Sequence, residues 1–411
     1  FNTPPFRAGI LSIPDCPTVP ADGVDWDVLS QLQMLFGTMQ ETLLRSVDTI
    51  CFCRTLRDFE GHAINLGQQM DANEFNNTLL DKVETALKKA PSHKDLLKVF
   101  QGSLVTQIVC KENPKHISSR EETFFSASLE IKNKKNIVEA LNLYVEGETL
   151  NGDNQYHCSQ CGKKVDAVRR ACFQTLPPTL LLHLKRFEFQ MDSMRNLKLN
   201  DACEFPMTLD MINYTVEGMS NKEGDDNPLP HPAWYYHYEL AGVVVHTGTA
   251  DGGHYYSFRR ENVPPYKKWF ELNDTTVREM DVKDLPRECF GGMEQAQVWN
   301  REQEAYVTVN RLKPNNAYIL FYQQSTPSTD APSVSIIPTI TPIISIEQSK
   351  GKGKEKMLDT EISSPPPLVS TSSATIAPTC WVQEGGVVKC SLPEPILRQI
   401  WVENERFLRK K

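Results

Sequence analysis

Residues 243–256 read VVVHTGTADGGHYY, an apolar run followed by a stretch in which a histidine, His254, comes directly after two glycines. The apolar residues 243–245 are typical of a buried strand, and a second strand pattern begins at Tyr255. Glycines let a backbone approach a ligand closely, and a histidine there can exchange protons near neutral pH. The stretch therefore predicts either a tight hairpin with an exposed histidine or a site in which His254 is a base.

A second segment, residues 269–274 (WFELND), favours the site. Its strand pattern ends on Asn273 and Asp274, whose side chains can accept the Nδ1–H of an imidazole. Thiol proteases need such a third group to fix the tautomer and orientation of the histidine. Histidine before the amide is the chain order of papain-like enzymes, in which the cysteine precedes both. Asn-Asp followed by Thr-Thr is also a good turn, so the pair carries weight only together with His254.

The secondary-structure pattern is α+β, with a helical start and a β-rich remainder. Apolar residues at spacings of three and four predict a helix within residues 26–44, and a second helix begins near Asp71, which has capping-box spacing to Glu74. After Phe100 the pattern changes to strands and turns. Strands are expected around 180–184, 243–245, 255–259, 269–272, 305–309 and 317–322.

Composition narrows the class of partner. The 411 residues carry a net charge of -8, which argues against nucleic acid or an anionic membrane as the main partner. No apolar stretch approaches the roughly twenty residues that a membrane helix needs. Eleven cysteines without a leader or a regular disulfide spacing indicate reduced thiols. We expect a soluble protein of the cytoplasm or the nucleus.

The chain divides into three parts. Residues 1–324 form the folded domain, and residues 325–379 are rich in Ser, Thr and Pro, a composition expected of a disordered linker. Residues 380–411 begin a C-terminal helical region, in which Ile396, Ile400 and Phe407 suggest an amphipathic helix that breaks off at the end of the chain.

Five motifs in order resemble the ubiquitin-specific protease family, over about residues 1–324. They are Gln69–Phe75 (QMDANEF), Leu180–Phe187 (LLLHLKRF), Gly253–Phe258 (GHYYSF), Asn273–Val277 (NDTTV) and Ala317–Tyr322 (AYILFY). Residues 205–216 further resemble the large fat-facets-like subgroup. The resemblance implies a papain-like finger-palm-thumb domain that hydrolyses the isopeptide or peptide bond after the C-terminal glycine of ubiquitin.

The resemblance also assigns roles. It implies that His254 is the general base and acid and that Asn273 orients it, with Asp274 as an auxiliary or alternative partner. It implies that Asp71 and Glu74 meet the basic tail of ubiquitin, although a capping box accounts for the same pair equally well. Gly252, Gly253 and Tyr255 would line the cleft for that tail. The implied partners are ubiquitin and ubiquitinated proteins, and catalysis needs no cofactor.

The nucleophile of the family is missing from this chain. In the family, a cysteine box that opens a helix immediately precedes a segment similar to residues 1–7, so we expect the nucleophile upstream of Phe1. Cys16 is the nearest alternative, but Pro17 follows it and no helix is expected to open there. The 411-residue chain alone is therefore predicted to be inactive. The other reading is a catalytically dead ubiquitin-binding or scaffold protein.

A zinc site is the last chemical feature. Cys158 and Cys161 have the spacing of half a zinc knuckle, and family members pair such a half with another Cys-x-x-Cys upstream. Here the upstream half begins at Cys110 but has Asn113 in the fourth position, and Asn is a poor zinc ligand. His116, or failing that His157, could complete a structural site. A zinc-bound tip and a reduced, metal-free tip both remain open.

Two further histidines, His183 and His246, lie within strand patterns. We expect both to be core histidines with satisfied hydrogen bonds rather than catalytic groups.

Overall fold

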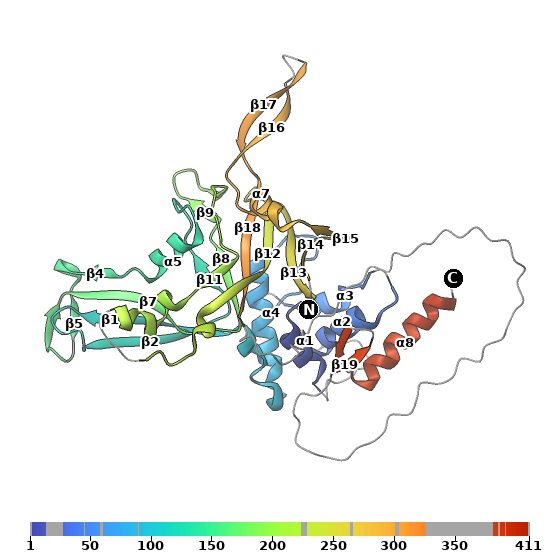
Figure 1. Ribbon diagram of the computed structural model, residues 1–411, viewed down its shortest axis with the longest axis horizontal. Helices are drawn as coiled ribbons and strands as arrows, with labels where there is room; N and C mark the ends of the chain where they lie inside the picture. The colour runs from blue at the N-terminus through green and yellow to red at the C-terminus, as the bar shows by residue number, and fades with distance from the viewer. Residues whose placement is uncertain are drawn as a thin grey trace, which may run out of the picture.

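The computed structural model describes residues 2–13, 28–44, 46–57, 61–88, 90–222, 228–263, 266–300, 304–325, 381–384, 387–390 and 392–409. Figure 1 shows a central sheet with helices on one side and an elongated β-rich arm on the other. This is the α+β arrangement that the sequence predicts.

The central sheet, here called the palm, carries both segments of the expected site (Figure 1). Its strand order is β15-β14-β13-β12-β18-β8-β3, with β11 paired to β12, and β3 runs parallel to β8. The strands are β3 (Ala127–Leu129), β8 (Thr179–Leu184), β11 (Thr208–Asp210), β12 (His237–Gly248), β13 (Gly253–Val263), β14 (Tyr266–Asn273), β15 (Thr276–Met280) and β18 (Asn315–Gln324).

Two hydrophobic cores lie on opposite faces of the palm. Strand β8 shows why, because Leu180, Leu182 and Leu184 pack in one core and Leu181 packs in the other. A continuous apolar run is what a strand buried on both faces requires. The second core joins the palm to the N-terminal helices.

These helices form the thumb: α1 (Pro4–Leu11), α2 (Val28–Glu41), α3 (Ile50–Cys53) and α4 (Ala72–Leu87). Helix α1 begins with two prolines, whose missing N–H groups would be unpaired there in any case. The helix expected within residues 26–44 is found, but it ends at Glu41, and Met39 and Leu43 are exposed rather than part of its buried face. The apolar spacing alone therefore predicted a helix that extends beyond the observed end.

The arm, here called the fingers, is a sheet of order β2-β1-β7-β4 that ends in a small hairpin (Figure 1). Its elements are β1 (Gly102–Cys110), β2 (Ile117–Phe124), β4 (Glu148–Leu150), β5 (Tyr156–Cys158), β6 (Lys163–Val165), β7 (Ala167–Thr175) and α5 (Ile137–Val145). The sequence reading expected strands after Phe100 and missed α5. The Asn136 side chain caps that helix by accepting the backbone N–H of Glu139 at 2.9 Å.

The remaining elements of the domain are smaller. They are β9 (Phe187–Gln190), β10 (Arg195–Lys198), α6 (Val216–Lys222), α7 (Leu285–Cys289), β16 (Met293–Asn300), β17 (Ala305–Leu312), and 3-10 turns at Pro91–His93, Leu96–Val99, Gly152–Asn154, Ile212–Tyr214, Ala233–Tyr236 and Val282–Asp284. Strands β16 and β17 form a ribbon that projects from the palm (Figure 1). None of the helices in the described part of the chain is long and apolar enough to span a membrane.

The C-terminal elements are β19 (Trp381–Glu384), β20 (Val387–Cys390) and α8 (Glu394–Arg409). Helix α8 packs on α2 through Ile396 and Ile400, both buried. The Asn404 side chain accepts the Leu43 N–H at 3.0 Å and donates to the Glu41 carbonyl at 3.2 Å. Glu41 is the last residue of α2 and Leu43 lies just beyond it. The Asn404 side chain of α8 therefore caps the C-terminus of α2. The expected linker, residues 325–379, lies outside the described residues apart from Ser325.

Candidate functional site

The hairpin of β12 and β13 presents the expected base. Gly248 pairs with Gly253 at its end, and Gly248 has a φ of 115°, which side chains rarely adopt. A Cβ on Gly253 would lie 2.1 Å from the Thr247 carbonyl oxygen and 2.5 Å from Nε2 of His246. A Cβ on Gly252 would meet nothing within 4 Å. Glycine is therefore required at 253 by contact and at 248 by conformation, but not at 252.

His254 and Asn273 meet across neighbouring strands. Nε2 of His254 lies 2.8 Å from Oδ1 of Asn273, the last residue of β14. The ring nitrogen differs from the expected one, because Nε2 and not Nδ1 faces the amide. An acceptor on Nε2 keeps the proton there and leaves Nδ1 free to accept one from a thiol. The arrangement thus has the geometry of a general base with its orienting group.

The orientation of Asn273 is itself supported. Its Nδ2 donates to Oε1 of Glu271 at 3.4 Å, which turns Oδ1 toward the histidine. Arg278 holds Glu271 through two hydrogen bonds of 2.9 and 3.0 Å and thereby lowers the pKa of that carboxyl group. Asp274 is a weaker partner, since its carboxylate lies 3.7 Å from Nε2 of His254 and is 75% exposed. Sequence reasoning missed Glu271 as part of this chain of contacts.

The thumb also holds the hairpin. Oε1 of Gln69, just before α4, accepts the backbone N–H of Gly253 at 3.1 Å. Tyr255 is half-buried, with its ring 5.6 Å from that of Tyr318 and 4.8 Å from that of His246. The Tyr255 side chain therefore packs between palm and thumb beside the base.

Asp71 and Glu74 differ in how they are used. One oxygen of Asp71 accepts the N–H groups of Asn73 and Glu74 at 2.8 and 3.0 Å, and the other accepts the Tyr318 hydroxyl. Asp71 is therefore the N-cap of α4, and through Tyr318 it also links α4 to the palm. Glu74 is exposed on the first turn of α4, so its carboxylate faces solvent. Of the pair, Glu74 is the side chain more open to a basic ligand.

Neither His183 nor His246 has hydrogen bonds on both ring nitrogens within the described residues. Nδ1 of His183 lies 2.9 Å from the Ser128 hydroxyl, but its Nε2 has no partner within the described residues. His246 is buried, and its Nδ1 likewise has none there. Burial lowers the pKa of each to about 4, so both rings are neutral near pH 7. Packing in the core is as expected, and full hydrogen bonding is not.

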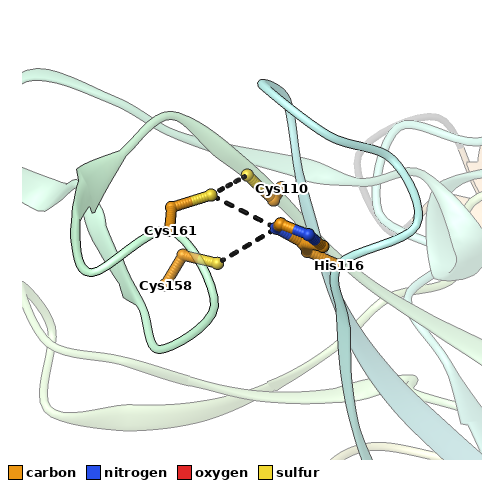
Figure 2. A group of neighbouring side chains, drawn as sticks. All are labelled: Cys110, His116, Cys158 and Cys161. Atoms are coloured by element: carbon orange, nitrogen blue, oxygen red, sulfur yellow. Dashed lines mark hydrogen bonds between the residues drawn. The ribbon is translucent and has the colours of Figure 1, made fainter.

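Three cysteines and one histidine gather at the tip of the fingers, as Figure 2 shows. Nδ1 of His116 lies 3.2 Å from the sulfur of Cys161 and 3.8 Å from that of Cys158, and the sulfurs of Cys110 and Cys161 are 3.8 Å apart. All four ligand atoms lie within 4.8 Å of one another. His157 is exposed and is not part of the group.

This group fits a zinc ion. Tetrahedral zinc with Zn–S near ~2.3 Å and Zn–N near ~2.1 Å separates its ligand atoms by about 3.5–3.8 Å, close to the distances found. Asn113 is not a ligand, because its side chain lies 3.0 Å from Nε2 of His116, on the far side of the ring. A histidine that binds metal through Nδ1 keeps its proton on Nε2 and needs an acceptor there. In this structure Nδ2 of Asn113 faces Nε2 of His116, and Oδ1 of Asn113 accepts the Lys115 N–H at 3.1 Å, so the amide as placed is not that acceptor.

No thiol partner of His254 occurs in the described part of the chain. None of the described cysteines is in a disulfide, and no hydrogen bond joins one to this histidine. Cys51 and Cys53 lie in α3 of the thumb. Cys110, Cys158 and Cys161 belong to the fingers group, and Cys172, Cys203 and Cys289 are buried. Cys16, the alternative nucleophile, lies outside the described residues.

Comparisons with known proteins agree with this geometry. A family model described as ubiquitin carboxyl-terminal hydrolase matches residues 1–322. The chain is 36% identical over 312 residues to human ubiquitin carboxyl-terminal hydrolase 34. The aligned region covers 74% of this chain and 9% of that protein. It is 36% identical over 315 residues to mouse ubiquitin carboxyl-terminal hydrolase 9X, covering 72% of this chain and 12% of the relative. The chain thus spans only about a tenth of these relatives.

A solved structure extends the likeness to the fold. It is the SAGA Ubp8/Sgf11/Sus1/Sgf73 deubiquitinating module bound to ubiquitin aldehyde, with a TM-score of 0.56 and 26% identity. The match covers 74% of this chain and 61% of that chain.

Proposed function

The chain belongs to the ubiquitin carboxyl-terminal hydrolase family, and on that premise we propose that it forms the ubiquitin-binding and general-base part of a thiol-dependent deubiquitinase. The reaction is hydrolysis of the isopeptide or peptide bond after the C-terminal glycine of ubiquitin. The observation that carries this proposal is the 2.8 Å contact between Nε2 of His254 and Oδ1 of Asn273. Because that contact engages Nε2, Nδ1 is the ring nitrogen that can take a thiol proton.

The steps follow from that arrangement. Nδ1 of His254 accepts the proton of a cysteine thiol while the sulfur attacks the carbonyl carbon of the ubiquitin C-terminal glycine. The C–N bond then breaks, the amine leaves with the proton from His254, and ubiquitin remains as a thioester. A water molecule, deprotonated by His254, attacks the thioester and releases the free carboxylate and the thiol. Throughout, Asn273 accepts the Nε2–H and keeps the ring in one orientation.

The thiol itself is proposed to come from a cysteine box encoded before Phe1. Support comes from the absence of any thiol hydrogen-bonded to His254 in the described residues. The 411-residue chain would then bind ubiquitin without cleaving it. If the upstream coding sequence holds no such cysteine, the protein is instead a non-catalytic ubiquitin-binding or scaffold protein, so reading that sequence separates the two functions.

We expect no labelling of the 411-residue chain by a ubiquitin probe that carries a C-terminal thiol-reactive group, because the chain would lack the attacking sulfur. The measurement is the mass shift after incubation, with Cys16→Ala alongside. The chain extended by its natural upstream sequence should label, and should cease to label when the box cysteine is replaced. Labelling of the unextended chain that disappears in Cys16→Ala would show that Cys16 is the nucleophile.

The ubiquitin tail is proposed to lie between α4 and the β12–β13 hairpin. Glu74 would pair with its basic residues, and Asp71 would support the helix that carries Glu74. Gly252 and Gly253 would let the tail pass close to the backbone, beside the ring of Tyr255. Ubiquitin and ubiquitinated proteins are the proposed partners, and the free thiols of the described cysteines fit the proposed cytoplasmic or nuclear location.

A structural zinc ion is proposed for Cys110, His116, Cys158 and Cys161, because their ligand atoms are already grouped. Zinc would fix the tip of the fingers, and it takes no part in the bond cleavage.

Elemental analysis of the purified chain is expected to give about one zinc per chain, and His116→Ala should lower that value well below half because three ligands hold zinc less tightly. His157→Ala is the matched control, since this neighbouring histidine is exposed and outside the group. Full occupancy in both His116→Ala and Cys158→Ser would mean that other residues bind the metal.

A further inference from the structure

Lys198, the last residue of β10, makes contacts that the proposed mechanism does not use. Its half-buried amine donates to three backbone carbonyls, those of His246 at 2.9 Å, Gly248 at 3.4 Å and Pro314. These carbonyls come from two different segments, the end of β12 and the residue before β18. One side chain therefore ties three strands together at a single point.

That point is the base of the turn that carries His254. Gly248 ends β12, and its N–H donates to the Pro314 carbonyl at 3.3 Å. The turn then closes through the Thr249 N–H, which donates to the Gly252 carbonyl at 2.9 Å. Gln69 holds the other end of the turn at the Gly253 N–H. Lys198 thus holds one strand at the base of the turn, and Gln69 of the thumb holds the other.

We propose that Lys198 is a positioning residue for His254, acting through the backbone of residues 246–248. The proposal rests on the proposed function of His254. A cationic donor shared by three carbonyls restrains them more strongly than neutral donors would. Without it, the carbonyls lose their common donor and the glycine at 248 leaves the turn with little intrinsic stiffness.

The contact persists at neutral pH. Burial, together with the neighbouring positive charge of Arg186, lowers the pKa of Lys198 to about 7. An amine that loses one proton keeps two N–H groups, so it can still donate to two of the three carbonyls. The ammonium form serves all three, and the neutral form keeps part of the anchor.

The first test uses hydrogen–deuterium exchange of the 411-residue chain, which needs no catalysis. Lys198→Met keeps the length of the side chain and removes the donor. We expect exchange at Gly248 and Thr249 to speed up about tenfold, while the β16–β17 ribbon stays unchanged. Lys185→Met is the control, because that lysine is exposed and pairs only loosely with Glu130 at 3.7 Å. Lys198→Arg, which keeps a cationic donor, should restore most of the protection.

The second test uses hydrolysis of a ubiquitin–fluorophore conjugate by the chain extended with its natural upstream sequence. Lys198→Met is expected to lower kcat about tenfold or more and to leave KM within about twofold, because a displaced base slows the chemistry more than it weakens binding. Lys198→Arg should recover much of kcat.

The outcomes separate the two proposals. If the extended wild-type chain does not hydrolyse the conjugate, the proposed function fails, and exchange at the turn still decides whether Lys198 anchors it. Unchanged exchange at Gly248 and Thr249 in Lys198→Met would overturn the inference. So would faster exchange over the whole domain, or equal losses in kcat and in ubiquitin affinity, since these indicate a general structural role.

Discussion

Gly253→Ala is expected to abolish hydrolysis by the chain extended with its natural upstream sequence, with a loss of at least about 100-fold. The added Cβ would lie 2.1 Å from the Thr247 carbonyl oxygen and 2.5 Å from Nε2 of the buried His246. Neither neighbour can move freely, because Thr247 pairs with His254 in the sheet and His246 packs between Phe187 and Tyr255. The hairpin must therefore open next to the base.

Gly252→Ala is the matched control for that substitution. The two glycines are adjacent, but a Cβ at 252 would meet no atom within 4 Å. We expect the thermal unfolding of Gly252→Ala to stay close to that of wild type, since open sites away from special backbone conformations tolerate substitution. Gly253→Ala should unfold at a clearly lower temperature, because its Cβ has no room. Equal unfolding temperatures for the two variants would show that crowding at Gly253 does not open the hairpin.

Arg186→Met is expected to cause the largest loss of stability, about 3–5 kcal/mol in the free energy of unfolding. The guanidinium is fully buried, and it donates to the carbonyls of Ala317 at 2.6 Å, Leu199 at 2.9 Å and Asp201 at 3.1 Å. Burial lowers its pKa to about 10, so the group stays charged at neutral pH. Methionine has no donor and would leave the buried Ala317 carbonyl without one, at about 1–3 kcal/mol, and the partly buried bonds to Leu199 and Asp201 would also be lost.

Urea or thermal unfolding measures that loss, and Lys185→Met is again the control. Lys185 is the preceding residue, yet its side chain is 52% exposed and its ion pair with Glu130 spans 3.7 Å. Such a pair contributes about 0–1 kcal/mol, so the control should unfold close to wild type. An Arg186→Met protein as stable as that control would mean that the carbonyls find other donors.

The sequence predicted those features that depend on local pattern. The α4 start at Asp71, the buried run of β8 and the strands that carry His254 and Asn273 are found where expected. The sequence pattern missed helix α5 and extended α2 past its end at Glu41. Apolar spacing does not report which side of a helix the fold will cover. The family resemblance that these motifs suggested is confirmed by the match over residues 1–322.

The sequence predicted that His254 and Asn273 would lie together, but it did not predict the groups that support them. His254 and Asn273 were paired correctly, yet the choice of Nε2 over Nδ1 depends on how the two strands are arranged in space. Lys198 and Pro314 are 116 residues apart in sequence, so no local pattern joins them. Likewise, His246 was expected to be fully hydrogen-bonded, but its neighbours are aromatic rings that offer Nδ1 no acceptor.

The packing of α8 on α2 affects how well another molecule could bind the same face of α2. Because the two helices belong to one chain, α8 is held near α2 at an effective concentration that no separate helix of equal affinity can match in dilute solution. A ligand that needed Gly37, whose hypothetical Cβ lies 2.8 Å from Ile396, would have to displace this tethered helix and would bind with correspondingly lower apparent affinity. That side of α2 is thus covered by α8 of the same chain.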